Sequence, residues 1–262
     1  MPTEEKHILA LSEDEIRTEL VYLQEEHNLL RPERSTIDPS RPWKNGLPNY
    51  DKADLLYFRG KTRNHTPESL EHIVENAVKT WEMEATHLGF QDWQSVNHDT
   101  YQVCANGAKT FKGEEAALAG NYNWLMAGVD KRLYDSNTET FESSHQLFRN
   151  TFPGGFPWEV LQVFSPPPRV SFSWRHWATF EEGGQFRGRK GDGKLYEMFG
   201  FGIVDLNADM KIESIEIFYK PEEFMKALHG EIPPSELAKG QSILGNGCPF
   251  LQGQPPKDQI TQ

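Results

Sequence analysis

WEVLQVF (158–164), VSFSWRHWATF (170–180), LYEMFGFGIVDL (195–206) and IESIEIFY (212–219) are four consecutive runs rich in β-branched and aromatic residues. This composition is typical of strands. The segments between the runs are rich in Pro, Gly, Asn and Asp, which favours tight turns and hairpins. Strands joined in this way pair antiparallel, so the four runs predict a curved, mostly antiparallel sheet around which the rest of the chain is organised.

A short amphipathic helix is predicted just before these strands, in FESSHQLFRNTF (141–152). Its apolar face includes His145, which makes that histidine a catalytic candidate. PGGF then ends the helix. Helices elsewhere in the chain must cover one face of the sheet, because an isolated half-apolar sheet would expose its core side. The predicted fold class is therefore α+β.

The charge of the chain excludes several kinds of partner. With 27 basic and 39 acidic residues the net charge is −12, which repels phosphate backbones and anionic membrane surfaces. We expect neither nucleic acid nor membrane as a partner. The first thirty residues lack a hydrophobic targeting region, and no apolar run approaches the ~20 residues that span a bilayer. Cys104 and Cys248 form no metal spacing and no disulfide framework, so we expect a soluble, cytoplasmic protein.

Three segments are expected along the chain. Residues 1–66 form an N-terminal helix and an extended strap, 67–229 the main domain, and 230–262 a tail without a core of its own. The helix begins at the capping box Ser12–Glu15 and continues to Arg31-Pro32. It either packs on its own domain or binds a partner. Four prolines mark the strap from 32 to 50, which Trp43 and Tyr50 anchor on the body.

A second helix, 67–87, is opened by Thr66-Pro67 and carries the first acidic candidate. Glu84 falls within its apolar stripe, so we expect a buried carboxylate with a raised pKa, suited to acid–base catalysis. The alternative is a side chain that reaches solvent at the helix end. Glu82 lies on the opposite side and is expected to be solvated. The stripe, in which Trp81 is a ligand-binding candidate, consists of Leu70, Ile73, Val74, Ala77, Trp81 and Leu88.

A third helical pattern covers 113–129 and places Asn121 and Tyr122 beside apolar residues. Both could bind a ligand, or they could satisfy loop backbone groups. Further on, the glycines of GGQFRGRKGDGK (183–194) do not follow a strand and precede a helix. They predict a hairpin, and they imply no nucleotide or phosphate site.

Strand alternation supplies the remaining candidates. In 170–180 the more apolar set contains Trp174 and His176, so His176 is expected to point inward, either as a catalytic residue or as a structural histidine bonded to a carbonyl. Trp174 is a ligand-binding candidate. By the same alternation Glu197 and Phe199 are expected to face the ligand, and Tyr219 is a catalytic candidate.

A metal site is the weaker interpretation. His145, His176 and Glu84 each lie on an inward face of a different element, but no pair of them has the local spacing of a known metal motif. We therefore expect neither a metal nor another cofactor.

The motifs FESSHxxFRxxFPxGFxWEVxxVxSxPP, RHW, GFGIV and IFYKPEEF, together with WxxGxPNYD (43–51) and LExIVxNAxKxWEMExxH (70–87), occur in this order. The pattern, which covers about 43–228, resembles the plant pathogen-related proteins of the SnoaL-like division of the nuclear-transport-factor-2-like superfamily. The resemblance implies a cone, in which a strongly bent sheet wraps around helices and encloses a deep apolar pocket. Relatives include polyketide cyclases, ketosteroid isomerases, limonene-type epoxide hydrolases and noncatalytic binders.

Two positions depart from the cyclase pattern. Lys220 stands where such cyclases carry an acidic base, and Phe180 stands where they tend to carry a histidine. The expected apparatus is instead isomerase-like, with a base and an oxyanion donor drawn from Glu84, His176, His145 and Tyr219.

Two classes of function are expected for such a pocket. The first is a cofactor-independent acid–base enzyme that cyclises, isomerises, dehydrates or hydrolyses an apolar polyketide or terpenoid. The alternative is a noncatalytic stress or pathogen-related protein that binds an apolar ligand. The sequence leaves a homodimer open.

Overall fold

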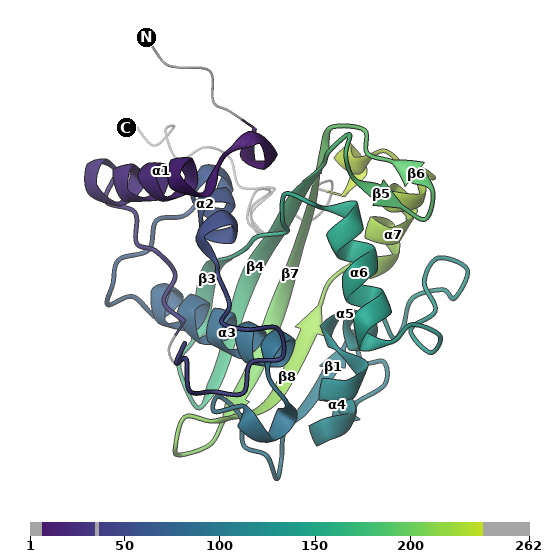
Figure 1. Cartoon of the computed structure of the whole chain (residues 1–262). Coiled ribbons are helices and arrows are strands. Elements are labelled where there is room, and N and C mark those ends of the chain that lie inside the picture. Colours follow the sequence, from purple (N-terminus) through teal and green to yellow (C-terminus); the bar gives the residue numbers. More distant parts are fainter. Residues whose placement is uncertain (1–6, 35–36, 238–262) are drawn as a thin grey trace, which may run out of the picture.

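The computed structural model describes residues 7–34 and 37–237 (Figure 1). Within them the main sheet has six strands in the order β2-β1-β8-β7-β4-β3, and every neighbouring pair is antiparallel except β1 and β8. The expected mostly antiparallel sheet is confirmed. Its strands are β1 (Gln102–Ala105), β2 (Phe111–Lys112), β3 (Trp158–Ser165), β4 (Arg169–Phe180), β7 (Lys194–Leu206) and β8 (Ile212–Phe218).

Two glycines in β7 let large aromatic side chains of β4 lie across that strand. In the register of the two strands Gly200 is opposite Trp174 and Gly202 is opposite Phe172. A Cβ atom built on Gly200 would lie 2.2 Å from Cζ2 of Trp174, closer than any real contact. The rings therefore occupy space that side chains of β7 would otherwise fill.

Helices cover the concave face of the sheet, and α3 (Leu70–His87) lies across it (Figure 1). The predicted helix is present, but Ser69 caps it by accepting a hydrogen bond from His72, so the helix begins after the expected Thr66. Trp81 is buried and its indole N–H donates to the Tyr101 hydroxyl at 3.0 Å. Its expected inward orientation is confirmed.

The helix expected over 113–129 is divided in two. Gly120 has a φ of 80° and separates α4 (Gly113–Ala119) from α5 (Asn121–Leu125). A Cβ atom at this position would lie 2.8 Å from Cδ2 of Phe141. The close approach of α6 (Phe141–Thr151) therefore requires glycine at the break.

The N-terminal segment forms a layer that packs against α3 and against Trp177, which is on the outer face of β4. The capping box at Ser12 opens α1 (Glu13–Glu26), which ends before the expected Arg31. A helix that the sequence analysis did not predict, α2 (Asp51–Gly60), packs with α1 over Trp177 of β4. The alternative in which the first helix packs on its own domain is the one observed.

A buried carboxylate fastens the chain after α2 to the sheet. Glu159 of β3 accepts hydrogen bonds from the backbone N–H and hydroxyl of Thr62 at 2.8 and 2.9 Å and from Arg175 Nη1 at 2.9 Å. Arg175 also donates to the Gly60 carbonyl at 2.8 Å. Because breaking a buried ion pair leaves an uncompensated charge, this contact holds the outer layer firmly.

The remaining elements are short, and β5 and β6 form the predicted glycine-rich hairpin. Of the expected tail 230–262, the described part packs on the core through Leu237, which is a correction, and the residues beyond it, with Cys248, lie outside the described residues. Across 7–34 and 37–237 no helix combines the length and apolarity needed to cross a membrane. The short elements are η1 (Ile8–Ala10), η2 (Phe90–Asp92), β5 (Gln185–Phe186), β6 (Arg189–Lys190), α7 (Pro221–His229) and η3 (Pro234–Glu236).

Candidate functional site

A cavity of about 770 Å³ lies between α3, the concave face of the sheet and the helices α5 and α6. Its walls are mostly apolar and rich in aromatic rings, which is the usual character of a small-molecule site. α3 forms part of the cavity wall, and residues on both sides of this helix line the cavity. Aromatic lining residues include Tyr50, Trp81, Tyr122, Phe156, Trp158 and Trp174.

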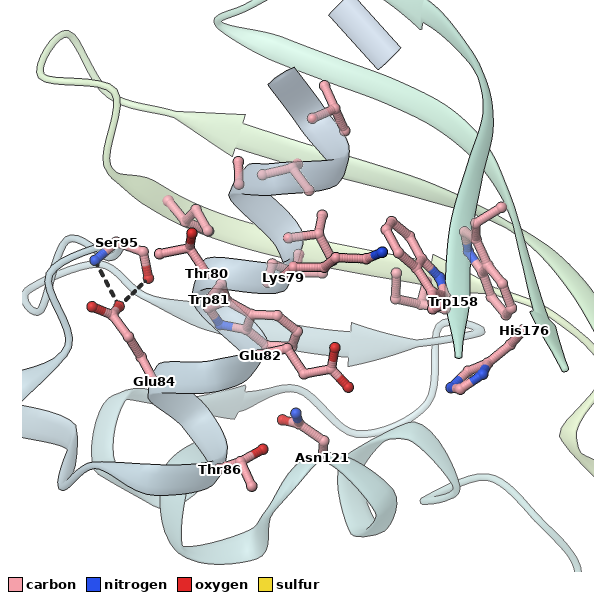
Figure 2. A pocket seen from close by; sticks show the side chains of 18 of the residues that line it. Lys79, Thr80, Trp81, Glu82, Glu84, Thr86, Ser95, Asn121, Trp158 and His176 are labelled. Carbon is pink, nitrogen blue, oxygen red and sulfur yellow. Dashed lines mark hydrogen bonds between the residues drawn. The ribbon is translucent and has the colours of Figure 1, made fainter. Parts of the chain in front are cut away.

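Glu84 is buried as expected, but its carboxylate is surrounded by hydrogen-bond donors rather than by apolar groups. It accepts hydrogen bonds from Arg41 Nη2 at 3.0 Å, from the Gln94 N–H at 3.0 Å, and from the N–H and hydroxyl of Ser95 at 2.9 and 2.6 Å. Figure 2 shows the side chain directed toward Ser95. The apolar setting predicted for Glu84 is wrong, and the carboxylate fixes the loop after α3 to the helix.

Glu82 is the acid that faces the cavity. Its side chain leaves α3 on the other side from Glu84 and points toward Asn121 and His176 (Figure 2). Within the described residues it accepts no hydrogen bond and forms no ion pair. Water can reach the Glu82 side chain from the cavity, but the surrounding protein replaces much of its bulk solvent. This desolvation raises the pKa of Glu82, and the charges of Arg34 and Lys79 act to lower it.

Glu82 is accessible to solvent, as expected, but it faces the cavity rather than the outer surface of the protein. Val78 and Ala85 lie near Glu82 on the surface of α3 and widen the apolar stripe toward it. These two residues are the sequence feature that could have identified Glu82 as a cavity residue.

His176 points inward and lines the cavity, as predicted. Its Nδ1 lies 2.8 Å from the Pro157 carbonyl oxygen, which can only accept a hydrogen bond, so Nδ1 carries the proton and Nε2 is the acceptor. The ring stacks on Phe156 with centroids 3.7 Å apart. Burial lowers the pKa of His176 to about 4, so the imidazole is neutral near neutral pH.

Tyr219 and His145 line the cavity, and each has one side-chain polar atom bonded to the backbone. The Tyr219 hydroxyl donates to the Leu125 carbonyl at 3.0 Å, and His145 Nδ1 lies 2.7 Å from the Phe141 carbonyl oxygen. His145 Nε2 has no hydrogen-bond partner in the part of the chain that the structure describes. Burial lowers the pKa of His145.

Asn121 and Tyr122 also line the cavity, and Tyr122 is the better placed polar group. Its ring stacks on Phe148 at 4.3 Å, and within the described residues its hydroxyl has no hydrogen-bond partner. Burial raises the pKa of Tyr122, so the hydroxyl keeps its proton and can donate it to a ligand oxygen. The Asn121 side-chain oxygen accepts a hydrogen bond from Trp124 Nε1 at 3.2 Å.

Glu197 and Phe199 do not reach the cavity, so their predicted position is wrong. In the strand register Trp177 is opposite Glu197 and Arg175 is opposite Phe199, which puts both candidates on the outer face. Glu197 accepts a hydrogen bond there from Arg175 Nε at 2.7 Å. Trp174, by contrast, lines the cavity as predicted.

The cavity also contains charged residues that the sequence analysis did not select. Lys79 of α3 is buried, with Nζ 3.6 Å from Glu75 and 3.4 Å from the centre of the Tyr57 ring. Burial lowers the pKa of Lys79 to about 8. In the sequence Lys79 lies on the polar side of α3, near Glu75 and Glu82. No periodic pattern therefore distinguishes it from a surface lysine.

The metal alternative is not supported by the arrangement of its proposed ligands. Among residues 7–34 and 37–237 no three His, Cys, Asp or Glu side chains are grouped as metal ligands. Glu84 is directed toward Ser95, away from His176 (Figure 2).

Comparison with solved structures gives matches of low similarity that cover about two thirds of this chain. A protein provisionally named a SnoaL-like polyketide cyclase, from Jannaschia sp., is 15% identical with a TM-score of 0.34, covering 64% of this chain and 97% of that one. A ketosteroid isomerase-like protein from Catenulispora acidiphila, in complex with trimethylamine, is 10% identical with a TM-score of 0.35, covering 65% and 98%.

A sequence relative is much closer. No family model matches the chain. The pathogen-related protein of Hordeum vulgare is 35% identical over 218 residues, which is 80% of this chain and 89% of the barley protein. Identity at this level over nearly the whole relative agrees with the motifs of 43–228 and with the bent sheet closed by helices. The chain belongs to the pathogen-related protein family.

Proposed function

We propose that this protein binds an apolar small molecule in the cavity and transforms it by acid–base chemistry, with Glu82 as the group that moves the proton. The observation that carries the proposal is a carboxylate without a protein partner that faces a cavity lined by aromatic rings. Leaving such a group unpaired costs stability. Raised pKa values in clefts are typical of catalytic acids and bases.

The geometry suits proton abstraction from a carbon next to a carbonyl group. Ionised Glu82 takes the proton and becomes a neutral acid, and the electron pair moves onto the carbonyl oxygen to give an enolate. The Tyr122 hydroxyl donates a hydrogen bond to that oxygen. Once its carboxyl proton has exchanged with solvent, Glu82 returns a solvent-derived proton to the same carbon, which gives exchange. In a β,γ-unsaturated ketone it instead delivers the proton to the γ-carbon, which gives isomerisation.

The raised pKa of Glu82 supports this role. A carboxylate whose pKa is raised is a stronger base than an ordinary surface carboxylate. Neutral His176 offers Nε2 as a hydrogen-bond acceptor, which fits a hydroxyl group of the ligand. Polyketides and terpenoids combine such carbonyl and hydroxyl groups with an apolar skeleton, so we propose them as the substrate class.

Deuterium exchange into β-tetralone, an apolar ketone with acidic hydrogens beside its carbonyl group, tests the proposal. We expect the wild-type protein to accelerate exchange in D₂O, and proton NMR measures the rate of this exchange. Glu82→Gln cannot accept the proton, so exchange should be at least ~100-fold slower while the circular dichroism spectrum is unchanged. The matched control is Glu25→Gln, on the exposed surface of α1.

Two outcomes would contradict the catalytic role. Exchange in Glu82→Gln at the wild-type rate would remove Glu82 from the mechanism. Binding of β-tetralone by the wild type, seen by saturation-transfer NMR, without any acceleration of exchange would favour the noncatalytic ligand-binding function.

A further inference from the structure

A group of basic side chains borders the cavity where α3 ends. His87, the last residue of α3, lines the cavity together with His145 and Arg149 of α6. Lys44 of the strap is adjacent, because its backbone N–H donates to the His87 carbonyl at 2.9 Å. The charges of Arg149 and Lys44 both act on His87 and on His145, so the four side chains lie within electrostatic reach of one another. We call these four residues the basic rim.

Arg149 differs from the other arginines near the cavity. Arg31, Arg34 and Arg41 each form an ion pair with a buried or partly buried carboxylate. Within the described part of the chain, Arg149 has no ion pair or hydrogen bond, although acidic residues greatly outnumber basic ones in this sequence. The charge of Glu142 acts on His145, and no ion pair joins it to Arg149 among the described residues. A guanidinium group on a cavity wall is thus left available for an anion.

His87 supplies a second, independent observation. Its Nδ1 atom is buried and has no hydrogen-bond partner. Buried polar atoms are nearly always bonded, and an exception inside a ligand cavity is best explained by a bond that forms when the ligand is present. The ring also meets the Tyr50 ring edge-on, with centroids 6.1 Å apart, which fixes its position at the cavity wall.

We propose that the basic rim binds the anionic end of the ligand, so that the substrate class is organic acids in which a carboxylate is joined to an apolar skeleton. Arg149 pairs with the carboxylate and His87 Nδ1 donates to it. This inference uses the cavity of the proposed function and adds a ligand group to it.

The positions of Arg149 and Glu82 also determine which way the ligand enters. The charges of both residues act on the Tyr122 hydroxyl, with opposite effects on its pKa, so Tyr122 is within electrostatic reach of each. An anionic ligand end is repelled by Glu82 and attracted by the rim. The carboxylate therefore stays at the rim, and the apolar skeleton lies beside Glu82 and Tyr122.

Two fluorescent probes with nearly the same aromatic body separate the rim from the cavity. Anilinonaphthalene sulfonate carries an anionic sulfonate in place of the carboxylate, and phenylnaphthylamine is its neutral counterpart. We expect the full-length protein to bind both probes and to bind the sulfonate about tenfold more tightly, which is the effect of one additional charge-assisted contact. About 0.5 M NaCl should reduce that preference, since salt screens accessible charges, and should leave the neutral probe unaffected.

Substitutions assign the preference to the rim. Arg149→Met, which keeps the length of the side chain, should weaken binding of the sulfonate about tenfold and leave the neutral probe unchanged. Arg149→Lys should keep most of the preference because it keeps the charge. The matched control is Arg63→Met, an exposed arginine away from the cavity.

Each contrary result has a separate meaning. Equal affinities for the two probes in the wild type, or equal weakening of both by Arg149→Met, would overturn the anion site while the cavity of the proposed function remains. A loss of sulfonate preference in Arg63→Met would show that general surface charge is responsible and would also overturn it. Failure of the wild type to bind either probe would overturn both proposals.

Discussion

The two carboxylates of α3 that matter most, Glu82 and Glu84, are separated by one residue and have opposite surroundings. Two positions along an α-helix turn the side chain by roughly 200°, so one acid faces the cavity and the other faces the loop at Ser95. Glu84 has four hydrogen bonds and Glu82 has no partner among the described residues. Substitutions at the two positions should therefore have different effects on stability.

We predict that Glu84→Gln lowers the free energy of unfolding by about 3–5 kcal/mol, because it removes the carboxylate that compensates the buried charge of Arg41. Glu82→Gln should leave the free energy of unfolding unchanged or raise it slightly, because it removes a desolvated acid. Urea unfolding of both variants makes the comparison. Equal losses of stability would mean that the two carboxylates do not have the separate roles assigned here.

Prediction of individual residues from sequence succeeded where one pattern decided the orientation. The alternation in β4 placed His176 and Trp174 correctly, because the apolar set was clear there. For α3 the stripe placed Trp81 correctly but did not identify the acid in the cavity. A helical stripe gives the direction of a side chain and not its partners, and the partners of Glu84 come from the strap and from the loop after the helix.

At the scale of single elements, β7 shows why alternation can fail. Its inward positions include Gly200 and Gly202, which have no side chains to mark the apolar face. Its outward positions include Phe199, because the outer face of this sheet is partly covered by the N-terminal layer. The aromatic residues therefore indicated the wrong face, and Glu197 was assigned with them.

The same glycines give a prediction for the strand. Gly200→Ala should lower the free energy of unfolding by about 1–3 kcal/mol, because the new Cβ atom would lie 2.2 Å from Trp174 and 2.6 Å from the Phe218 carbonyl oxygen. Binding of phenylnaphthylamine should also weaken, since Trp174 forms part of the cavity wall. Thermal unfolding and fluorescence titration measure the two effects.

Gly183→Ala is the control for this substitution. A Cβ atom there meets nothing within 4 Å, and the residue is not in the left-handed region. Its stability should be unchanged or slightly higher, because alanine restricts the unfolded chain. A Gly200→Ala variant as stable as this control would show that the strand tolerates a side chain at that position.

At the scale of the whole molecule, the division into a 1–66 extension and a 67–229 domain remains a proposal, and the packing argues against an independent main domain. Trp177 is only 4% exposed because α1 and α2 cover it. Glu75 of α3 accepts hydrogen bonds from the Tyr57 hydroxyl of α2 and, at 2.8 Å, from the Val160 N–H of β3. The sequence analysis did not predict α2, whose buried apolar residues Leu55, Tyr57 and Phe58 pack with Trp177.

We therefore predict that a fragment without residues 1–66 does not give a stable monomer. Its outer face would expose Trp177 and leave Arg175 without the Gly60 carbonyl and Glu159 without the two Thr62 donors. Exposed apolar surface of this kind leads to association. Size-exclusion chromatography and thermal unfolding should show aggregation or a much lower midpoint than the full chain. A monomeric fragment with cooperative unfolding would instead establish 67–229 as an autonomous domain.

The attachment of α2 to the far strands also has a consequence for the order of events during protein synthesis. Gly60 leaves the ribosome long before Trp177, on which its helix packs. At a synthesis rate of about 5–20 residues per second, the apolar side chains of the N-terminal helices wait on the order of ten seconds for their surface to exist. Throughout that interval the N-terminal helices stay accessible to nascent-chain chaperones, until β4 emerges and supplies Trp177.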